Sequence, residues 1–356
     1  MLSTYRTVRI PRQARDERPS KQFAASSEAM MADNKRTSSM TIQETLHSIT
    51  QQIAPLYHES ERATIALWIL EKITNMSHIE LITHSSSLLT EQQQKTLDTF
   101  LHEHIVDHKP LQYLIGSVPF LDLEIRVRPP ILIPRPETEE WCIELIEQLS
   151  NLPHQSLTIL DMCTGSGCIG LSLASALPAS TIYAVDISPF ACELTRDNAL
   201  SNHISNVQII QSDLFSSLPA NVKFDLIVSN PPYISGEEYE TLDESVKNWE
   251  DPRALVAQEN GLEILKKIIF QSRVWLKPNL AYLSQRKEMQ DPAIPQVAKE
   301  MQDLDIPQLA VEIGYNQGTL VQALFEEAGY SNVKIHQDFA GKDRLVSGNY
   351  YAINSS

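Results

Sequence analysis

The chain has 356 residues and a mass of 40.2 kDa, a length typical of two domains and too great for a minimal scaffold held by disulfides or metal. Its 45 acidic residues outnumber the 29 Lys and Arg, and the net charge of -16 disfavours a general binder of nucleic acid or membrane surfaces. With 42% hydrophobic and 21% charged residues, the composition excludes global disorder.

The cysteines point to a reducing compartment. The four of them, Cys142, Cys163, Cys168 and Cys192, form no CxxC pair and have no histidines at zinc-ligand spacing, so we expect reduced thiols in a cytoplasmic protein and no metal site. The longest strongly apolar stretch, residues 63–70, is far shorter than the roughly 20 residues of a membrane span. No secretory signal is apparent at the N-terminus either.

Residues 1–40 differ from the rest of the chain. They hold eight basic and four acidic side chains, a net charge of +4 that leaves -20 for the remainder, and show little apolar periodicity. We interpret them as a disordered extension or as the product of an upstream start codon, with Met30, Met31 or Met40 as the true start. An organelle-targeting arm is disfavoured by Asp16 and Glu17.

Residues 41–109 are predicted to form a small all-α bundle. Apolar residues recur at helical spacing, first at Ile42, Leu46, Ile49 and Ile53 and then in two further stretches, 63–73 and 97–105. Thr90 and Gln93 have the spacing of a capping box at the start of the last helix. No cluster of ligand-type residues occurs here, so a helical cap without chemistry of its own is the simplest interpretation.

Residues 110–136 are predicted to be a β-hairpin linker. Apolar residues alternate at Leu121, Leu123, Ile125 and Val127, and a stiff proline-rich run follows, from Pro129 to Pro136.

From residue 137 to 356 helices and strands alternate. We predict a helix at 137–150, another beginning near Gly167, and strands at 157–162, 181–185, 207–210 and 224–228. This rhythm indicates an α/β, Rossmann-like, doubly wound domain, a parallel sheet with helices on both faces.

An insertion at about 279–308 contains a tandem repeat. The ten residues from Lys287 to Gln296 return at Lys299 to Gln308, identical at eight of ten positions with a period of 12, too short for a solenoid unit. We interpret it as a duplication in a surface loop; a loop that docks a partner is the alternative.

A glycine-rich turn is the first candidate site. The segment Asp161 to Gly170 follows a predicted strand and opens a predicted helix. Its glycines, among them Gly165 and Gly167, allow a tight turn and the close approach of a ligand to the backbone, while the helix N-terminus offers amide donors to a negative group. Asp186 ends the next strand, where a carboxylate can accept the hydroxyls of a ribose. Taken alone, this pattern fits a nicotinamide enzyme almost as well as an S-adenosylmethionine site.

The tetrapeptide Asn230-Pro231-Pro232-Tyr233 separates these alternatives. It follows an apolar strand, and the carboxyl ends of parallel strands face the ligand crevice. The side-chain oxygen of Asn230 and the carbonyl of Pro231 can accept the two protons of a planar NH2 group, and Tyr233 can lie on its face. This arrangement suits methyl transfer to that nitrogen, where positive charge develops.

With these motifs the sequence resembles the peptide chain release factor glutamine methyltransferases, the HemK/PrmC family of class I S-adenosylmethionine-dependent methyltransferases. The resemblance runs from about residue 41 to 351 and rests on stretches in family order: QYLIG at 112–116, LIPRPETE at 132–139, DMCTGSG at 161–167, AVD at 184–186, SDLF at 212–215, SNPPYI at 229–234 and EIG at 312–314. It implies methylation of the side-chain amide nitrogen of the glutamine in the GGQ motif of class I release factors, a step in translation termination.

The resemblance also implies residue roles. Asp161, Cys163, Thr164, Gly165, Ser166 and Gly167 would form the cofactor loop, Asp186 would hold the ribose, Asp213 and Leu214 would border the adenine, and Asn230 would adjoin the cofactor. Asn230, Pro231, Pro232 and Tyr233 would bind the substrate glutamine and carry catalysis, while Arg135 and Glu137 would close the site on the substrate. The helical domain at 41–109 would recognise the release factor. The chain departs from the family at the insertion and at residues 1–40, which have no family counterpart.

A DNA or RNA exocyclic-amine methyltransferase is the alternative. It explains the glycine turn and the NPPY tetrapeptide, but it needs a basic target-recognition region, whereas residues 41–110 hold nine acids against four bases. A nicotinamide oxidoreductase explains only the glycine turn and Asp186. We therefore expect a release factor as the partner and no stable binding of nucleic acid or membrane.

Overall fold

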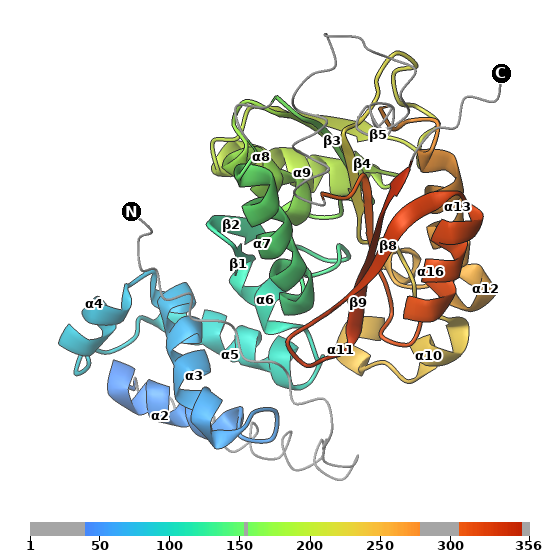
Figure 1. Ribbon diagram of the computed structural model, residues 1–356. Helices are drawn as coiled ribbons and strands as arrows, with labels where there is room; N and C mark the ends of the chain where they lie inside the picture. The colour runs from blue at the N-terminus through green and yellow to red at the C-terminus, as the bar shows by residue number, and fades with distance from the viewer. Residues whose placement is uncertain (1–39, 153–155, 278–305, 351–356) are drawn as a thin grey trace, which may run out of the picture. The chain divides into compact units, whose positions relative to one another are not determined.

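The computed structural model describes residues 40–152, 156–277 and 306–350, and within them the chain divides into two compact units (Figure 1). The first unit runs to Gly116 and also contains Glu244–Trp249, and the second contains the remainder. The predicted N-terminal extension, and all but the last three residues of the predicted repeat, lie outside the described residues. Each unit has a hydrophobic core of its own.

The first unit is helical, as the apolar periodicity predicts. Its helices are α2 (Ile42–Gln52), α3 (Glu59–Thr74), α4 (His78–Thr83), α5 (Glu91–Ile105), α6 (Leu111–Ile115) and α11 (Glu244–Lys247). The predicted capping box of α5 is confirmed: the Gln93 amide donates to Thr90 Oγ1 at 3.2 Å, and the Thr90 amide donates to Gln93 Oε1 at 2.9 Å. Within this unit the Trp249 indole donates to the carbonyl of Asp107 at 3.0 Å, which ties the segment after α11 to the bundle.

A β-hairpin opens the second unit. Strands β1 (Ser117–Phe120) and β2 (Leu123–Arg126) pair antiparallel, and the buried residues Leu123, Ile125 and Val127 follow the predicted alternation. The expectation for Leu121 is wrong, because it lies in the turn with φ of 51° rather than on a strand.

The second unit is built on a seven-stranded sheet of order β5-β4-β3-β6-β7-β9-β8. Its strands are β3 (Thr158–Met162), β4 (Thr181–Asp186), β5 (Val207–Gln211), β6 (Leu226–Ser229), β7 (Leu309–Glu312), β8 (Tyr330–Gln337) and β9 (Asp343–Tyr350). Strands β3 to β7 are parallel, as predicted, but β9 is antiparallel to both β7 and β8. The strands predicted from the sequence are thus parallel, and the antiparallel edge is made by β8 and β9, which were not predicted; the short connection between these two strands suits an antiparallel pair.

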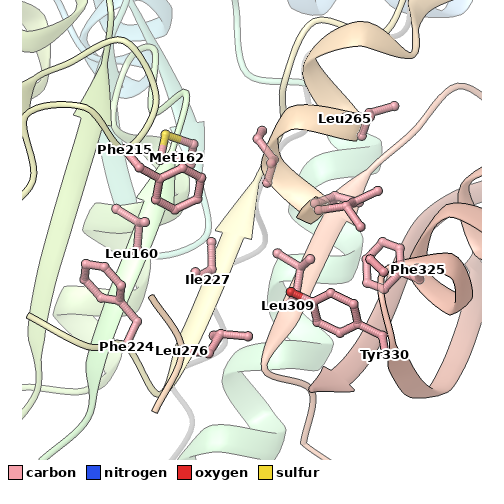
Figure 2. Close-up of a cluster of buried hydrophobic side chains, with 14 of the residues drawn as sticks. Leu160, Met162, Phe215, Phe224, Ile227, Leu265, Leu276, Leu309, Phe325 and Tyr330 are labelled. Carbon is pink, nitrogen blue, oxygen red and sulfur yellow. The ribbon is translucent and has the colours of Figure 1, made fainter. Parts of the chain in front are cut away.

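Helices cover both faces of this sheet, as a doubly wound domain requires. They include α7 (Pro136–Ser150), α8 (Cys168–Ala176), α9 (Pro189–Ser201), α13 (Glu263–Ser272) and α16 (Gly318–Glu327). Two short helices, α10 (Gly236–Glu240) and α12 (Gln258–Gly261), follow β6 in the chain. Alternate side chains of a strand face opposite sides. Leu160, Ile227 and Leu309 face the core shared with α13 and α16 (Figure 2), so their strand neighbours Asp161 and Glu312 face the α7 side.

Among the described residues, no helix combines the length and the apolar character that crossing a bilayer requires. All four cysteines, each within the described residues, are free thiols, as predicted.

Candidate active site

Polar side chains gather at the carboxyl ends of four neighbouring parallel strands. Asp186 ends β4, Asp161 lies one residue before the end of β3, Asn230 follows β6, and Glu312 ends β7. Because these strands are adjacent and parallel, their ends form one edge of the sheet. The structure thus brings together Asp161, Asp186 and Asn230, which the sequence singled out, and adds Glu312.

Asp161 organises the glycine-rich turn. Its side chain is fully buried, and Oδ2 accepts hydrogen bonds from Thr164 Oγ1 at 2.5 Å and from the Gly170 amide at 2.9 Å. A Cβ at position 170 would lie only 2.8 Å from that oxygen, so the close approach of helix α8 to Asp161 requires glycine here.

The second carboxylate oxygen of Asp161 is buried and has no hydrogen-bond partner. Burial raises the pKa of this carboxyl to about 7, although the Thr164 and Gly170 hydrogen bonds oppose the shift. A buried acceptor without a donor fits a ligand that brings a proton or a positive charge to this point.

Asp186 is tied to the same turn. Its Oδ2 accepts from the Gly165 amide and its Oδ1 from the Ser188 amide, both at 2.9 Å. Each oxygen keeps a further lone pair for a hydroxyl group. Burial raises the pKa of Asp186, and these amides oppose the shift. Two amides of the turn are already paired within the protein, because the Gly165 amide bonds Asp186 and the Gly167 amide donates to the carbonyl of Thr164.

The remaining residues expected at the cofactor lie around this turn. Cys163 and Leu214 adopt positive φ values of 63° and 47°, and both pack against the core shared with α13 and α16. Ser166 is buried and its carbonyl accepts from Asn198 Nδ2 at 2.8 Å, while Asp213 is exposed. A Cβ on Gly165 would meet only Ile131, at 4.0 Å, so the turn is open on that side.

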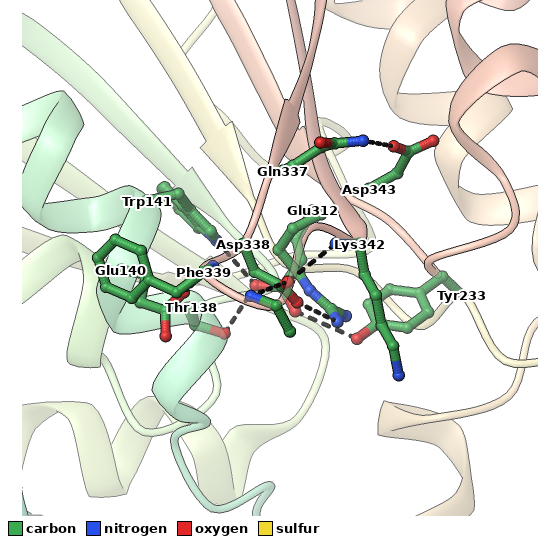
Figure 3. A network of polar contacts seen from close by, with 12 residues as sticks. Thr138, Glu140, Trp141, Tyr233, Glu312, Gln337, Asp338, Phe339, Lys342 and Asp343 are labelled. Carbon is green, nitrogen blue, oxygen red and sulfur yellow. Dashed lines mark hydrogen bonds and ion pairs between the residues drawn. The ribbon is translucent and has the colours of Figure 1, made fainter.

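Asn230 is held by one end of its amide. Nδ2 donates to Thr138 Oγ1 at 3.3 Å, and among the described residues nothing donates to Oδ1. Thr138 Oγ1 in turn donates to Glu312 Oε2 at 2.6 Å. The Tyr233 hydroxyl donates to Glu312 Oε1 at 3.1 Å, as Figure 3 shows.

Contacts with three later segments of the chain fix the backbone at the end of the NPPY tetrapeptide. Gln317 Nε2 donates to the carbonyl of Tyr233 at 2.9 Å, and a Cβ on Gly261 would lie 2.0 Å from the same oxygen. Ile234, the next residue, exchanges backbone hydrogen bonds of 2.9 and 3.0 Å with Leu255 and Ala257. Gly261 has φ of 84°, so both its conformation and its surroundings exclude a side chain.

Comparison with known proteins gives this arrangement a family. A family model described as the PrmC N-terminal domain matches residues 44–116, and one described as the methyltransferase small domain matches 144–248. The release factor glutamine methyltransferase of Lactococcus lactis is 37% identical over 279 residues, covering 78% of this chain and 90% of that relative. The one from Escherichia coli is 35% identical over 306 residues, covering 86% and 98%.

The chain belongs to the release factor glutamine methyltransferase family.

Solved structures of methyltransferases are more distant. A ribosomal protein L11 methylase from Lactobacillus delbrueckii is 19% identical with a TM-score of 0.40, covering 64% of this chain and 86% of that one. At this level the match does not distinguish one function from another.

The family stretch at 132–139 contains Arg135, Glu137 and Thr138. The guanidinium of Arg135 donates from Nη2 to both oxygens of Glu250, at 2.6 and 2.7 Å, and Glu250 is only 3% exposed. Burial raises the pKa of the Glu250 carboxyl, and Arg135 opposes the shift. Glu137 lies half-buried in the first turn of α7.

Several residues of this site received no role from the sequence, namely Thr138, Trp141, Glu250, Gly261, Glu312 and Gln317. Thr138, Glu312 and Gln317 occur in or beside stretches that match the family, so their presence was visible but not their contacts. Glu312 carried a usable signal, because a charged residue that ends an apolar strand of a parallel sheet lies at the ligand edge.

Proposed function

We propose that the protein transfers a methyl group from S-adenosylmethionine to the side-chain amide nitrogen of a glutamine in class I peptide release factors, within their GGQ motif. Membership of the release factor glutamine methyltransferase family supports the reaction and the kind of substrate. The observation that carries the proposal is the orientation of the Asn230 side-chain amide. Its nitrogen donates to Thr138, so its oxygen can accept a hydrogen bond from a substrate.

The residues around the glycine-rich turn fit S-adenosylmethionine. The unpartnered buried oxygen of Asp161 offers an acceptor for a positive group. The turn leaves space beside Gly165. The remaining lone pairs of Asp186 can accept hydrogen bonds from ribose hydroxyls. Cys163, Asp213 and Leu214 would border the rest of the cofactor. When bound, the cofactor supplies an electrophilic methyl group on a sulfonium centre.

The NPPY tetrapeptide would bind the substrate amide. Asn230 Oδ1 and the carbonyl of Pro231 accept its two protons, and the ring of Tyr233 lies against its plane. These contacts turn the nitrogen lone pair toward the methyl donor, and the two acceptors stabilise the positive charge that grows on nitrogen.

We assign the helical unit and the segment 132–139 to the macromolecular substrate. The helical unit, with nine acids against four bases over residues 41–110, suits a protein partner better than a polyanion. The Arg135–Glu250 pair would hold the segment that closes the site. A substrate that is part of the translation apparatus makes the cytoplasm the place of action.

The test is incubation with labelled S-adenosylmethionine and, in separate reactions, a release factor, the same factor with its GGQ changed to GGA, and duplex DNA. We expect label only on the unchanged release factor. Label on the GGA factor would contradict the assignment of the target glutamine, and label on DNA would favour the nucleic-acid alternative.

A further inference from the structure

A single buried carboxylate joins the two polar side chains of the NPPY tetrapeptide. Glu312 is 1% exposed and accepts three hydrogen bonds, from Thr138 and Trp141 on Oε2, at 2.6 and 2.9 Å, and from Tyr233 on Oε1 at 3.1 Å (Figure 3). An ionised carboxylate has the lone pairs to accept all three. Burial raises the pKa of Glu312, and these donors oppose the shift.

The donors fix a direction along the chain of hydrogen bonds. The indole N–H of Trp141 can only donate, and so can the Nδ2 group of Asn230. Since Thr138 Oγ1 accepts from Asn230 Nδ2, its one proton is left for Glu312. The order Asn230 to Thr138 to Glu312 therefore runs from donor to acceptor throughout.

This direction selects one orientation of the Asn230 amide. A flipped amide would present Oδ1 to Thr138, and the threonine would have to turn its proton away from Glu312 to satisfy it. The buried carboxylate would then lose a donor, which is costly for a charge in the protein interior. The network thus decides between two orientations that differ only in the exchange of N and O.

We propose that Thr138 and Glu312 are positioning residues, which hold the Asn230 oxygen and the Tyr233 ring toward the substrate glutamine. The inference rests on the proposed function and adds the residues that make Asn230 an acceptor rather than a donor. Neither residue touches the reacting atoms in this assignment; Thr138 acts through Asn230, and Glu312 acts through Thr138 and Tyr233.

The direct test compares Thr138→Val with Thr138→Ser in the full chain. Valine keeps the shape of threonine without the hydroxyl, so the Asn230 amide loses the hydrogen bond that fixes its orientation. We therefore expect kcat for methylation of a release factor to fall by about 10- to 100-fold. The dissociation constant for S-adenosylmethionine should stay unchanged, since Thr138 is not part of the glycine-rich turn. Serine keeps the hydroxyl and should recover most of the lost rate.

Two further variants guard against a purely structural effect. Ser272→Ala also removes a buried hydroxyl, one that bonds the Tyr330 hydroxyl at 2.6 Å in the core, and it should change the melting temperature without changing kcat. Where Thr138→Val does not fold, Thr138→Ala replaces it. A Thr138→Val enzyme that folds and works at the parental rate overturns the inference while leaving the proposed function intact.

A double-mutant cycle with Asn230→Ala locates the effect. If Thr138 acts only by orienting the Asn230 amide, Thr138→Val should cause no further loss of single-turnover rate once that amide is gone. Losses that multiply would show that Thr138 acts elsewhere and would overturn the inference. Failure of the parental enzyme to methylate a release factor would instead refute the proposed function.

Discussion

At the scale of the residue, Asn230 carries the sharpest expectation. Asn230→Ala removes an acceptor whose hydrogen bond strengthens as charge develops on the substrate nitrogen, so turnover should fall more than cofactor affinity. By analogy with the loss of one oxyanion-hole donor, we expect about a 100- to 1000-fold decrease in rate, roughly 2.7 to 4 kcal/mol. Single-turnover methylation of a release factor at saturating cofactor measures it.

Asn230→Asp refines the same test. Aspartate keeps an acceptor but loses the donor that bonds Thr138, so partial activity is expected, between the alanine variant and the parent. An alanine variant that methylates at the parental rate is the result that would refute the NPPY mechanism for this protein.

We expect Asp161 to make cofactor affinity depend on pH. Its pKa of about 7 means that the carboxyl gains its negative charge as the pH rises through neutrality. If the unpartnered oxygen faces a positive group of S-adenosylmethionine, affinity should rise by about five- to tenfold between pH 6 and 7.5. Calorimetry over this range measures it, and Asp161→Asn should bind weakly with little pH dependence; an equally steep profile in that variant would assign the titration to another group.

The same shift has a cost for the ligand-free protein. A carboxyl whose pKa is higher in the folded than in the unfolded state binds more protons when folded, so its effect on stability is least unfavourable at low pH. The free energy of unfolding should therefore decrease as the pH rises from the unfolded pKa near 4 to the folded pKa of about 7. Bound cofactor should offset the loss, which a comparison of melting temperatures at pH 5.5 and 7.5 with and without ligand tests.

At the scale of the element, the end of α12 packs against the NPPY backbone. Gly261→Ala would place a Cβ 2.0 Å from the carbonyl of Tyr233 at a φ of 84°. We expect a loss of about 1 to 3 kcal/mol of stability and a lower kcat, because the tetrapeptide must shift. Gly236→Ala is the matched control, since a Cβ there meets nothing within 4 Å; equal effects of the two substitutions would contradict this explanation.

The elements themselves follow from local patterns wherever burial is regular. Short apolar runs predict the buried strands β3 and β4, and Thr90 with Gln93 predicts the start of α5. The predicted strand at 224–228 begins later, at Leu226, because Phe224 pairs only with Leu276 in an isolated bridge. The antiparallel pairing of β9 with β8 follows from the short connection between them, but the pairing of β9 with β7 is a tertiary contact that no local pattern predicts.

The sequence predicts the motifs of the site but not the contacts that orient their side chains. Asp161, Asp186 and Asn230 could be placed at one edge of the sheet because each follows or ends a parallel strand. The contacts that orient them connect distant parts of the chain: 174 residues separate Thr138 from Glu312, and 115 separate Arg135 from Glu250. Such pairs follow from the tertiary fold, which a single sequence does not specify by spacing.

At the scale of the whole molecule, the residues that flank the insertion before β7, Lys277 and Gln308, lie next to each other. Gln308 Nε2 donates to the carbonyl of Lys277 at 3.0 Å, while the Lys277 amide bonds the carbonyl of Phe224 and the Ile227 amide bonds that of Gln308. Both ends of the insertion are thus fixed to β6 and its approach. The cost of closing a loop between fixed ends changes slowly with its length.

Deleting residues 287–298, one copy of the repeat, should therefore leave the rate of methyl transfer and the cofactor affinity close to the parental values. Methylation of a release factor and a thermal melt measure both function and fold. A folded variant that has lost methyl transfer would show instead that the repeat docks the substrate.

The closure at Lys277 and Gln308 also divides the enzyme into two complementary pieces of chain. Residues before it carry the glycine-rich turn, Thr138 and Asn230, and residues after it carry Glu312 with strands β7, β9 and β8. Each piece alone lacks part of the network that orients Asn230. If the chain is opened between residues 277 and 306, we therefore expect methyl transfer only when the two fragments reassemble, so that activity would report their association.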